Sequence, residues 1–105
     1  MTSHEQLTWR VRANYYPSWR ALGGHLTLSA EGLAFEPHGL DRATGGNRPW
    51  AAGLEAIVEV RAHRSGMVPR KRLVVRTADG VEALFLVPRV EDRARELRQV
   101  VGLTG

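Results

Sequence analysis

Cysteine is absent from the 105 residues, which excludes disulfide bonds and thiol catalysis. Because small secreted domains often depend on disulfides, this absence favours a reducing, cytoplasmic setting. Long apolar runs are missing too, since the longest, residues 83–87, is far shorter than the roughly 20 residues that a membrane span needs. The polar residues 1–6 lead into no apolar stretch. We therefore expect no signal peptide and no transmembrane segment, and any membrane contact would be peripheral.

Recognisable catalytic motifs are missing as well. The sequence holds no phosphate-loop motif, and its serines lie in no nucleophile-elbow pattern. No two of the histidines (His4, His25, His38 and His63) are placed at the spacing of metal ligands. The nearest approach to a metal site is His38 with Asp41, and a solvated histidine beside a turn-capping aspartate explains that pair more simply. We expect no enzymatic activity, no metal and no cofactor.

Apolar and polar residues alternate along much of the chain. Residues 7–15 carry an apolar side chain at every second position, which is typical of a strand with one buried face. Asp79-Gly80 is the strongest hairpin turn, because both residues tolerate positive φ. With this first strand, the pattern predicts seven short strands: residues 7–15, 25–29, 33–36, 50–54, 57–63, 72–77 and 82–87.

The apolar period changes after Pro88. Four apolar residues from Val90 to Val101 share one helical face, which predicts a C-terminal helix over residues 90–101. Within it, Glu91 and Arg95 form an i,i+4 pair, and Gly102 suits the C′ position. We expect one mostly β domain, preceded by a disordered tail at residues 1–6. The predicted core consists of Leu7, Trp9, Val11, Leu26, Leu28, Phe35, Val58, Val60, Leu73, Val75, Phe85 and Leu97.

Three segments resemble the GRAM domain family, over roughly residues 7–101. Residues 23–38 (GGHLTLSAEGLAFEPH) are similar to its glycine-led hairpin, in which an apolar-Thr-apolar strand turns into an apolar-x-Phe strand before a proline. Trp50 with residues 54–57 (LEAI), and residues 77–85 (TADGVEALF), resemble later segments of the family. Residues 51–53 (AAG) depart from it, because the family usually has Ile or Val and Pro there. The resemblance implies a seven-stranded antiparallel barrel or sandwich of the pleckstrin-homology type, closed by a C-terminal helix, that binds ligands without catalysis.

Positive charge is concentrated in one predicted hairpin. The net charge is +4, and fourteen of the fifteen basic residues are arginine. The stretch from Glu59 to Arg76 holds six bases and one acid, whereas the rest of the chain holds nine bases and ten acids. Such a patch attracts phosphate groups or acidic protein surfaces. The predicted ligand-binding residues are Arg20, Arg61, Arg64, Arg70, Lys71 and Arg72, together with Trp19, which could insert at a membrane interface.

Simpler explanations compete at each of these positions. A GC-rich genome enriches arginine for coding reasons, and charge on a strand edge protects against aggregation without binding anything. Trp19 could equally close the mouth of the barrel. Two functions therefore remain open: recognition of anionic ligands such as lipid headgroups or phosphorylated groups, and a protein-interaction or self-association module that binds no lipid. A nucleic-acid partner is disfavoured, because no recognition helix is visible.

Overall fold

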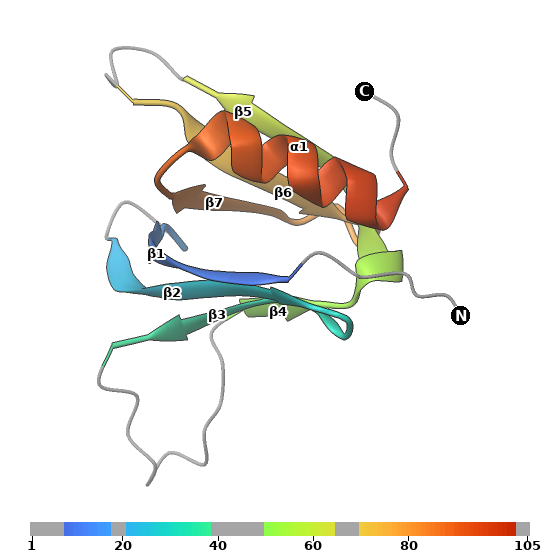
Figure 1. Cartoon of the computed structure of the whole chain (residues 1–105), viewed down its shortest axis with the longest axis horizontal. Helices are drawn as coiled ribbons and strands as arrows, with labels where there is room; N and C mark the ends of the chain where they lie inside the picture. The colour runs from blue at the N-terminus through green and yellow to red at the C-terminus, as the bar shows by residue number, and fades with distance from the viewer. Residues whose placement is uncertain (1–7, 18–20, 39–49, 65–69, 103–105) are drawn as a thin grey trace, which may run out of the picture.

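The computed structural model describes residues 8–17, 21–38, 50–64 and 70–102. Within them the chain forms seven strands, a one-turn 3₁₀ helix and one α-helix (Figure 1). Their bounds are β1 (Trp9–Tyr15), β2 (Leu22–Ser29), β3 (Gly32–Pro37), β4 (Trp50–Ala52), the 3₁₀ helix Leu54–Ala56, β5 (Ile57–His63), β6 (Arg72–Thr77), β7 (Glu82–Leu86) and α1 (Val90–Val101). The predicted mostly β architecture with a C-terminal helix is confirmed. The predicted tail (residues 1–6) and Leu7 lie outside the described residues.

All seven strands belong to one antiparallel sheet in the order β4-β3-β2-β1-β7-β6-β5. β1 pairs with β2 along its whole length, but it pairs with β7 only at Asn14–Leu86 and Tyr15–Phe85. Beyond this short junction the sheet separates into a β1–β4 part and a β5–β7 part. Figure 1 shows the two parts as layers, with α1 lying along β5 and β6.

Aromatic side chains join the two layers. The Trp50 and Phe85 rings lie 5.2 Å apart, although three strands separate β4 from β7 in the sheet order. Tyr15 contacts both Phe35 and Phe85, at 5.3 and 5.2 Å. These contacts show that the sheet curls around one core. The buried apolar residues of that core are Ala13, Tyr15, Leu26, Leu28, Leu33, Phe35, Ile57, Val60, Leu73, Val75, Ala83, Phe85, Val87, Ala94 and Leu97.

Most of the predicted core is confirmed. Eight of its members are buried: Leu26, Leu28, Phe35, Val60, Leu73, Val75, Phe85 and Leu97. Trp9 and Val11 are half-buried and pack against the core from β1. Val58 was predicted to be buried, but the prediction is wrong, because 41% of this residue is exposed. A β-bulge between Ile57 and Glu59 adds one residue to β5, which turns Val58 outward while Ile57 and Val60 face the core.

Two local predictions are also corrected. The fourth strand ends at Ala52 instead of Leu54, because the backbone N–H of Ala56 donates to the Gly53 carbonyl at 3.0 Å and closes the 3₁₀ turn. The expected Glu91–Arg95 pair does not form, since Glu91 binds Lys71, immediately before β6, and Arg95 binds Asp92. Two turn predictions are confirmed, because Gly102 and Gly80 both take positive φ, at 79° and 89°.

The outer face of the β5–β7 layer carries a network of ion pairs. Glu59 on β5 accepts hydrogen bonds from Arg61 at 2.7 Å and from Arg76 on β6 at 2.9 Å. Arg61 also lies 3.5 Å from Glu82 on β7. Val74 in the middle of this face is 1% exposed, although it does not belong to the core cluster. The network therefore ties three strands together over an apolar floor.

Because of this network, the stability of the fold should depend on pH. Hydrogen bonds from Arg76, and then from Arg61, hold the pKa of Glu59 below its usual value. Because the folded-state pKa is depressed, the stabilisation is present above the unfolded carboxyl pKa and is lost as pH falls through the folded one. We expect Glu59→Gln to lower the melting temperature at pH 7, and this deficit to shrink as pH falls through the folded-state pKa of Glu59. Glu31→Gln, at an exposed carboxylate outside the network, is the control, and a Glu59→Gln deficit that persists in acid would contradict the assignment.

Candidate functional site

Basic side chains gather at one end of the barrel. In an antiparallel meander alternate connections lie at the same end, so the β1–β2, β3–β4 and β5–β6 connections share an end with the turn between β7 and α1. Arg64, Arg70, Lys71 and Arg89 all lie there, close to the start of β6 or the end of β7. We call this the basic end. Two adjoining hollows open on it, and Arg70 lines both.

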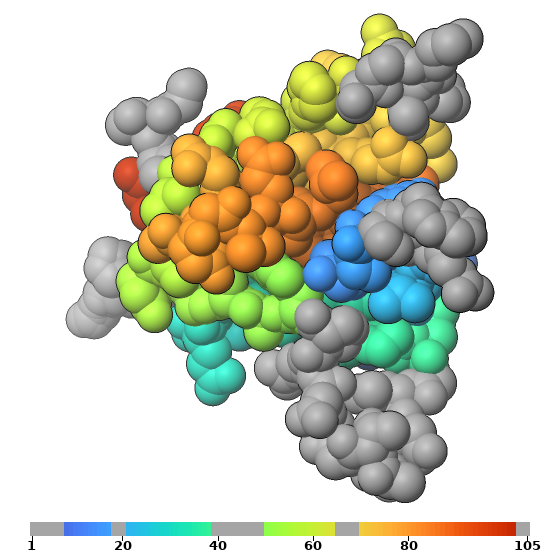
Figure 2. All heavy atoms as spheres, turned by 180° about the vertical axis from the view of Figure 1, so that it is seen from behind, coloured from blue at the N-terminus to red at the C-terminus, as the bar shows by residue number. Residues whose placement is uncertain are grey.

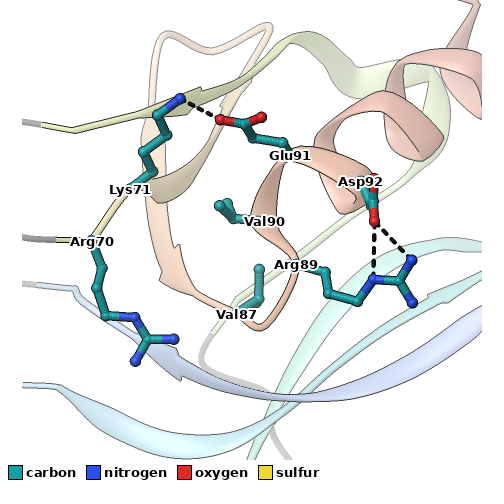
Figure 3. A pocket seen from close by; sticks show the side chains of 7 residues that line it. All are labelled: Arg70, Lys71, Val87, Arg89, Val90, Glu91 and Asp92. Carbon is teal, nitrogen blue, oxygen red and sulfur yellow. Dashed lines mark hydrogen bonds and ion pairs between the residues drawn. The ribbon is translucent and has the colours of Figure 1, made fainter.

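The first hollow, of about 490 Å³, lies between the start of β6 and the start of α1 (Figure 3). Its lining residues are Arg70, Lys71, Val87, Arg89, Val90, Glu91 and Asp92. Two of its three cations meet carboxylates, because Lys71 binds Glu91 and Arg89 binds Asp92 at 2.9 Å. Figure 3 shows the Arg70 side chain extending away from Lys71, without a carboxylate partner. The free positive charge of the first hollow therefore resides on Arg70.

Arg89 has the one left-handed backbone conformation among the non-glycine residues described, with φ 54°. This conformation is uncommon for a side chain of this size, and it occurs at the N-cap of α1 directly after Pro88. The guanidinium is then held by Asp92, which also binds Arg95. Arg95 and Arg89 together hold the pKa of Asp92 below its usual value, as Lys71 does for the pKa of Glu91. Both carboxylates thus stay ionised at neutral pH and neutralise the rim of α1.

The second hollow, of about 580 Å³, lies where β1 and β7 diverge. Its lining residues are Arg12, Ala13, Asn14, Gly23, Gly24, His38, Arg70, Leu86, Val87 and Pro88. Among the residues that the structure describes, this lining includes no carboxylate, in contrast to the first hollow. Arg12 and Arg70 make no ion pair with the residues that the structure describes. Two guanidiniums with free donors can bind a phosphate or carboxylate through charge-assisted hydrogen bonds.

The residues predicted to bind ligand are distributed unevenly. Arg70 and Lys71 come together at the basic end, and Arg64 is exposed nearby. Arg72 lies over the Tyr16 ring, 4.5 Å from its centroid. Arg61 faces the outer side of the β5–β7 layer and is engaged in the Glu59 network. Trp19 and Arg20 lie outside the described residues, as does Asp41 of the considered His38–Asp41 pair.

Sequence reasoning missed four residues of the hollows: Arg12, Asn14, Gly23 and Arg89. Strand alternation does place Arg12 and Asn14 on the outer face of β1, so part of the signal was present. Their proximity to Arg70, however, depends on the β1–β7 junction, which joins segments more than 70 residues apart. No local pattern reports that junction.

Two further features of the structure concern metal ions and membranes. Among residues 8–17, 21–38, 50–64 and 70–102, no three or more His, Cys, Asp or Glu side chains are grouped so that they could hold a metal ion. In the same part of the chain, no helix has the length and apolar character needed to cross a membrane.

Comparison with known proteins bears on the fold. No family model matches the sequence, and no curated protein matches it. Among solved structures, the C-terminal domain of an unknown protein from Leishmania infantum superposes with a TM-score of 0.72 at 11% identity, covering 89% of this chain and 81% of that one. The PH domain of human oxysterol binding protein-related protein 11 superposes with a TM-score of 0.62 at 12% identity, covering 95% and 80%. With its seven-stranded antiparallel sheet and C-terminal helix, the chain has a pleckstrin-homology-like fold.

Proposed function

We propose that this chain is a non-catalytic module that binds anionic groups, either lipid headgroups or phosphorylated ligands, at its basic end. The supporting observation is Arg70, which lines both hollows and has no ion-pair partner among the described residues. A buried or paired arginine stabilises the fold, whereas an exposed guanidinium between two hollows is available to a ligand. Lys71 and Arg89 contribute more weakly, because carboxylates already neutralise them.

The finer family assignment belongs to this proposal. We infer that the chain is a GRAM-type member of the fold, and the pattern of residues 23–38 supports this, because it folds as the β2–β3 hairpin. In this hairpin Gly32, with φ 141°, ends a turn that begins after Ser29. The corresponding cellular setting is cytoplasmic, with peripheral contact to a membrane surface.

Vesicle co-sedimentation tests the proposal. The protein should bind vesicles of increasing anionic lipid content at low salt, and high salt should release it, because screening shortens electrostatic attraction. An exposed arginine near an anionic surface contributes about 1 kcal/mol, so Arg70→Gln should weaken binding about fivefold. Arg76→Gln is the matched control, since Arg76 lies on β6 and binds Glu59, and neither residue lines a hollow. Failure of the wild-type protein to bind any anionic vesicle at low salt would overturn the proposal.

A protein-interaction role is the second candidate, and a groove at the opposite end of the barrel favours it. The groove lies between β4, whose second edge has no strand partner, and the β6–β7 turn. Its lining is mainly apolar and includes Trp50, Ala51 and Val81, which is 50% exposed. Figure 2 shows the β6–β7 turn (orange) beside the β4 segment (green) on this side of the molecule. Light scattering over a concentration series would detect self-association.

A further inference from the structure

The second hollow has a floor made by glycine. Asn14 on β1 pairs with Gly23 on β2, and the backbone N–H of His38 donates to the Gly23 carbonyl at 2.9 Å. These three residues therefore form a row across three adjacent segments. A Cβ atom at Gly23 would lie 3.4 Å from Asn14 Oδ1 and 3.5 Å from His38 Cδ2. The Asn14 and His38 side chains thus flank a gap that one missing side chain leaves open.

Donor groups surround this gap. Arg12 and Arg70 line the same hollow, and their guanidiniums offer only donors. Asn14 presents its amide Oδ1, an acceptor, toward the gap, so its N–H groups face a ligand there once the amide turns over, and His38 adds an imidazole with an N–H to donate. A phosphate monoester has oxygen acceptors and carries about two negative charges at neutral pH, so it complements a donor-rich, carboxylate-free lining.

We infer that the second hollow, which we now call the Gly23 hollow, binds a phosphate monoester group, and that the His25–His38 pair strengthens this binding as pH falls. This inference rests on the proposed function, because it names the group recognised at the basic end and the condition that tunes its affinity. The phosphate could belong to a free phosphate ester or to a lipid headgroup, and the chemistry of the hollow is the same for both.

The surroundings of the two histidines explain the pH dependence. The His25 and His38 rings meet edge to face, with centroids 5.2 Å apart. His25 faces the guanidiniums of Arg10 and Arg12 from β1, Glu36 from β3, and His38 immediately after β3. Partial burial, then Arg10, His38 and Arg12, lower the pKa of His25, while Glu36 opposes them. This cluster is therefore short of negative charge when the hollow is empty.

A bound dianion changes that balance. It lies beside His38 and close to His25, and a nearby negative charge favours the protonated form of His25. By linkage, affinity rises as pH falls through the range in which His25, whose pKa is lowered in the free protein, takes up its proton. The phosphate itself titrates near pH 6, in the direction that would weaken its binding in acid. A sulfate ester, whose charge is constant over this range, separates the protein's titration from the ligand's.

The experiment measures dissociation constants between pH 8 and pH 5.5 for three probes: glycerol phosphate, methyl sulfate and vesicles that contain phosphatidic acid. We expect Gly23→Ala to weaken the phosphate probes about tenfold, the equivalent of one hydrogen bond to a charged group. We expect His38→Gln to flatten the rise in methyl sulfate affinity toward acid pH. The control His63→Gln, at an exposed histidine that lines neither hollow, should keep both behaviours.

The outcomes separate this inference from the proposed function. If Arg70→Gln weakens binding while the Gly23→Ala and His38→Gln variants bind like the wild type, the basic end binds anions, and the assignment of the phosphate group to the Gly23 hollow is wrong. If no probe binds the wild type, both fail. Sensitivity to Gly23→Ala with glycerol phosphate supports a free phosphate ester, and sensitivity with vesicles alone supports a lipid headgroup. Melting curves report whether each variant is folded, and His38→Gln tests the hollow without adding volume to a strand.

Discussion

Replacing Arg12, Arg64 and Arg70 together with glutamine is expected to weaken binding to anionic vesicles about hundredfold, since each exposed arginine near such a surface contributes about 1 kcal/mol. None of the three makes an ion pair with a described residue, and all are exposed. Their removal therefore leaves no carboxylate unpaired, and the melting temperature should change little. Co-sedimentation at low salt, repeated at high salt, measures the loss.

A second triple variant makes this prediction specific. Arg61→Gln, Arg76→Gln and Arg95→Gln also remove three positive charges, but Arg61 and Arg76 bind Glu59 away from the hollows, and Arg95 lines neither hollow and binds Asp92 at the rim of the first. At physiological ionic strength the Debye length is about 8 Å, so distant charges contribute little to a local site. We expect this variant to bind several times more tightly than the first. Equal losses in the two variants would mean that vesicles sense only net charge, and the basic end would not be a site.

The fold was largely predictable from the sequence, for a physical reason. One face of β1 and of β2 packs against the core while the other is more exposed, so apolar side chains recur with period two along β1 and at Leu26 and Leu28 of β2. The change in the spacing of apolar residues after Pro88 predicts the helix, and the predicted bounds, residues 90–101, agree with α1. Hairpin turns that require positive φ are visible as glycines, as at Gly80.

The predictions are wrong where a local irregularity or a distant residue overrides the pattern of apolar and polar residues. At Val58 the bulge inserts a residue, so the alternation predicted for β5 fails at this position, while Val60 stays buried and Ala62 packs against the core. Residues 53 and 54 were predicted to continue the fourth strand, because nothing in the composition there reports the hydrogen bond from the Ala56 N–H to the Gly53 carbonyl. The predicted Glu91–Arg95 pair is wrong for a related reason, because Lys71, which is 20 residues away in the sequence, binds Glu91 instead.

The candidate site was less predictable than the fold. The sequence identified a basic stretch, but it could not tell which arginines would meet carboxylates. That outcome depends on the cross-strand register, which places Arg76 opposite both Glu59 and Glu82 and so disperses the predicted patch. It also depends on the β1–β7 junction, which brings Arg12 near Arg70. Charge counts along the chain carry neither kind of information.

The adjacent glycines of β2 should differ strongly in their response to the same substitution. A Cβ atom at Gly24 would lie 2.1 Å from the Glu36 carbonyl oxygen and 2.6 Å from Pro37 Cα, both of them backbone atoms of β3. Neither can move without breaking the β2–β3 ladder, in which Gly24 pairs with Pro37. We expect Gly24→Ala to lower the free energy of unfolding by about 3 kcal/mol, at the upper end for overpacking. The shift of the urea midpoint measures this change.

Gly23→Ala is the matched control, because its Cβ atom meets only side chains at ordinary contact distances. Its free energy of unfolding should stay within about 0.5 kcal/mol of the wild type, as for most exposed positions. The two variants differ by one position and carry the same added methyl group, so any difference between them reflects the surroundings of each glycine. If both destabilise the fold equally, Gly23 is a structural residue, and the open gap between Asn14 and His38 follows from strand packing alone. If only Gly24→Ala destabilises the fold, folding does not require the gap at Gly23, and this result favours a role of the gap in ligand binding.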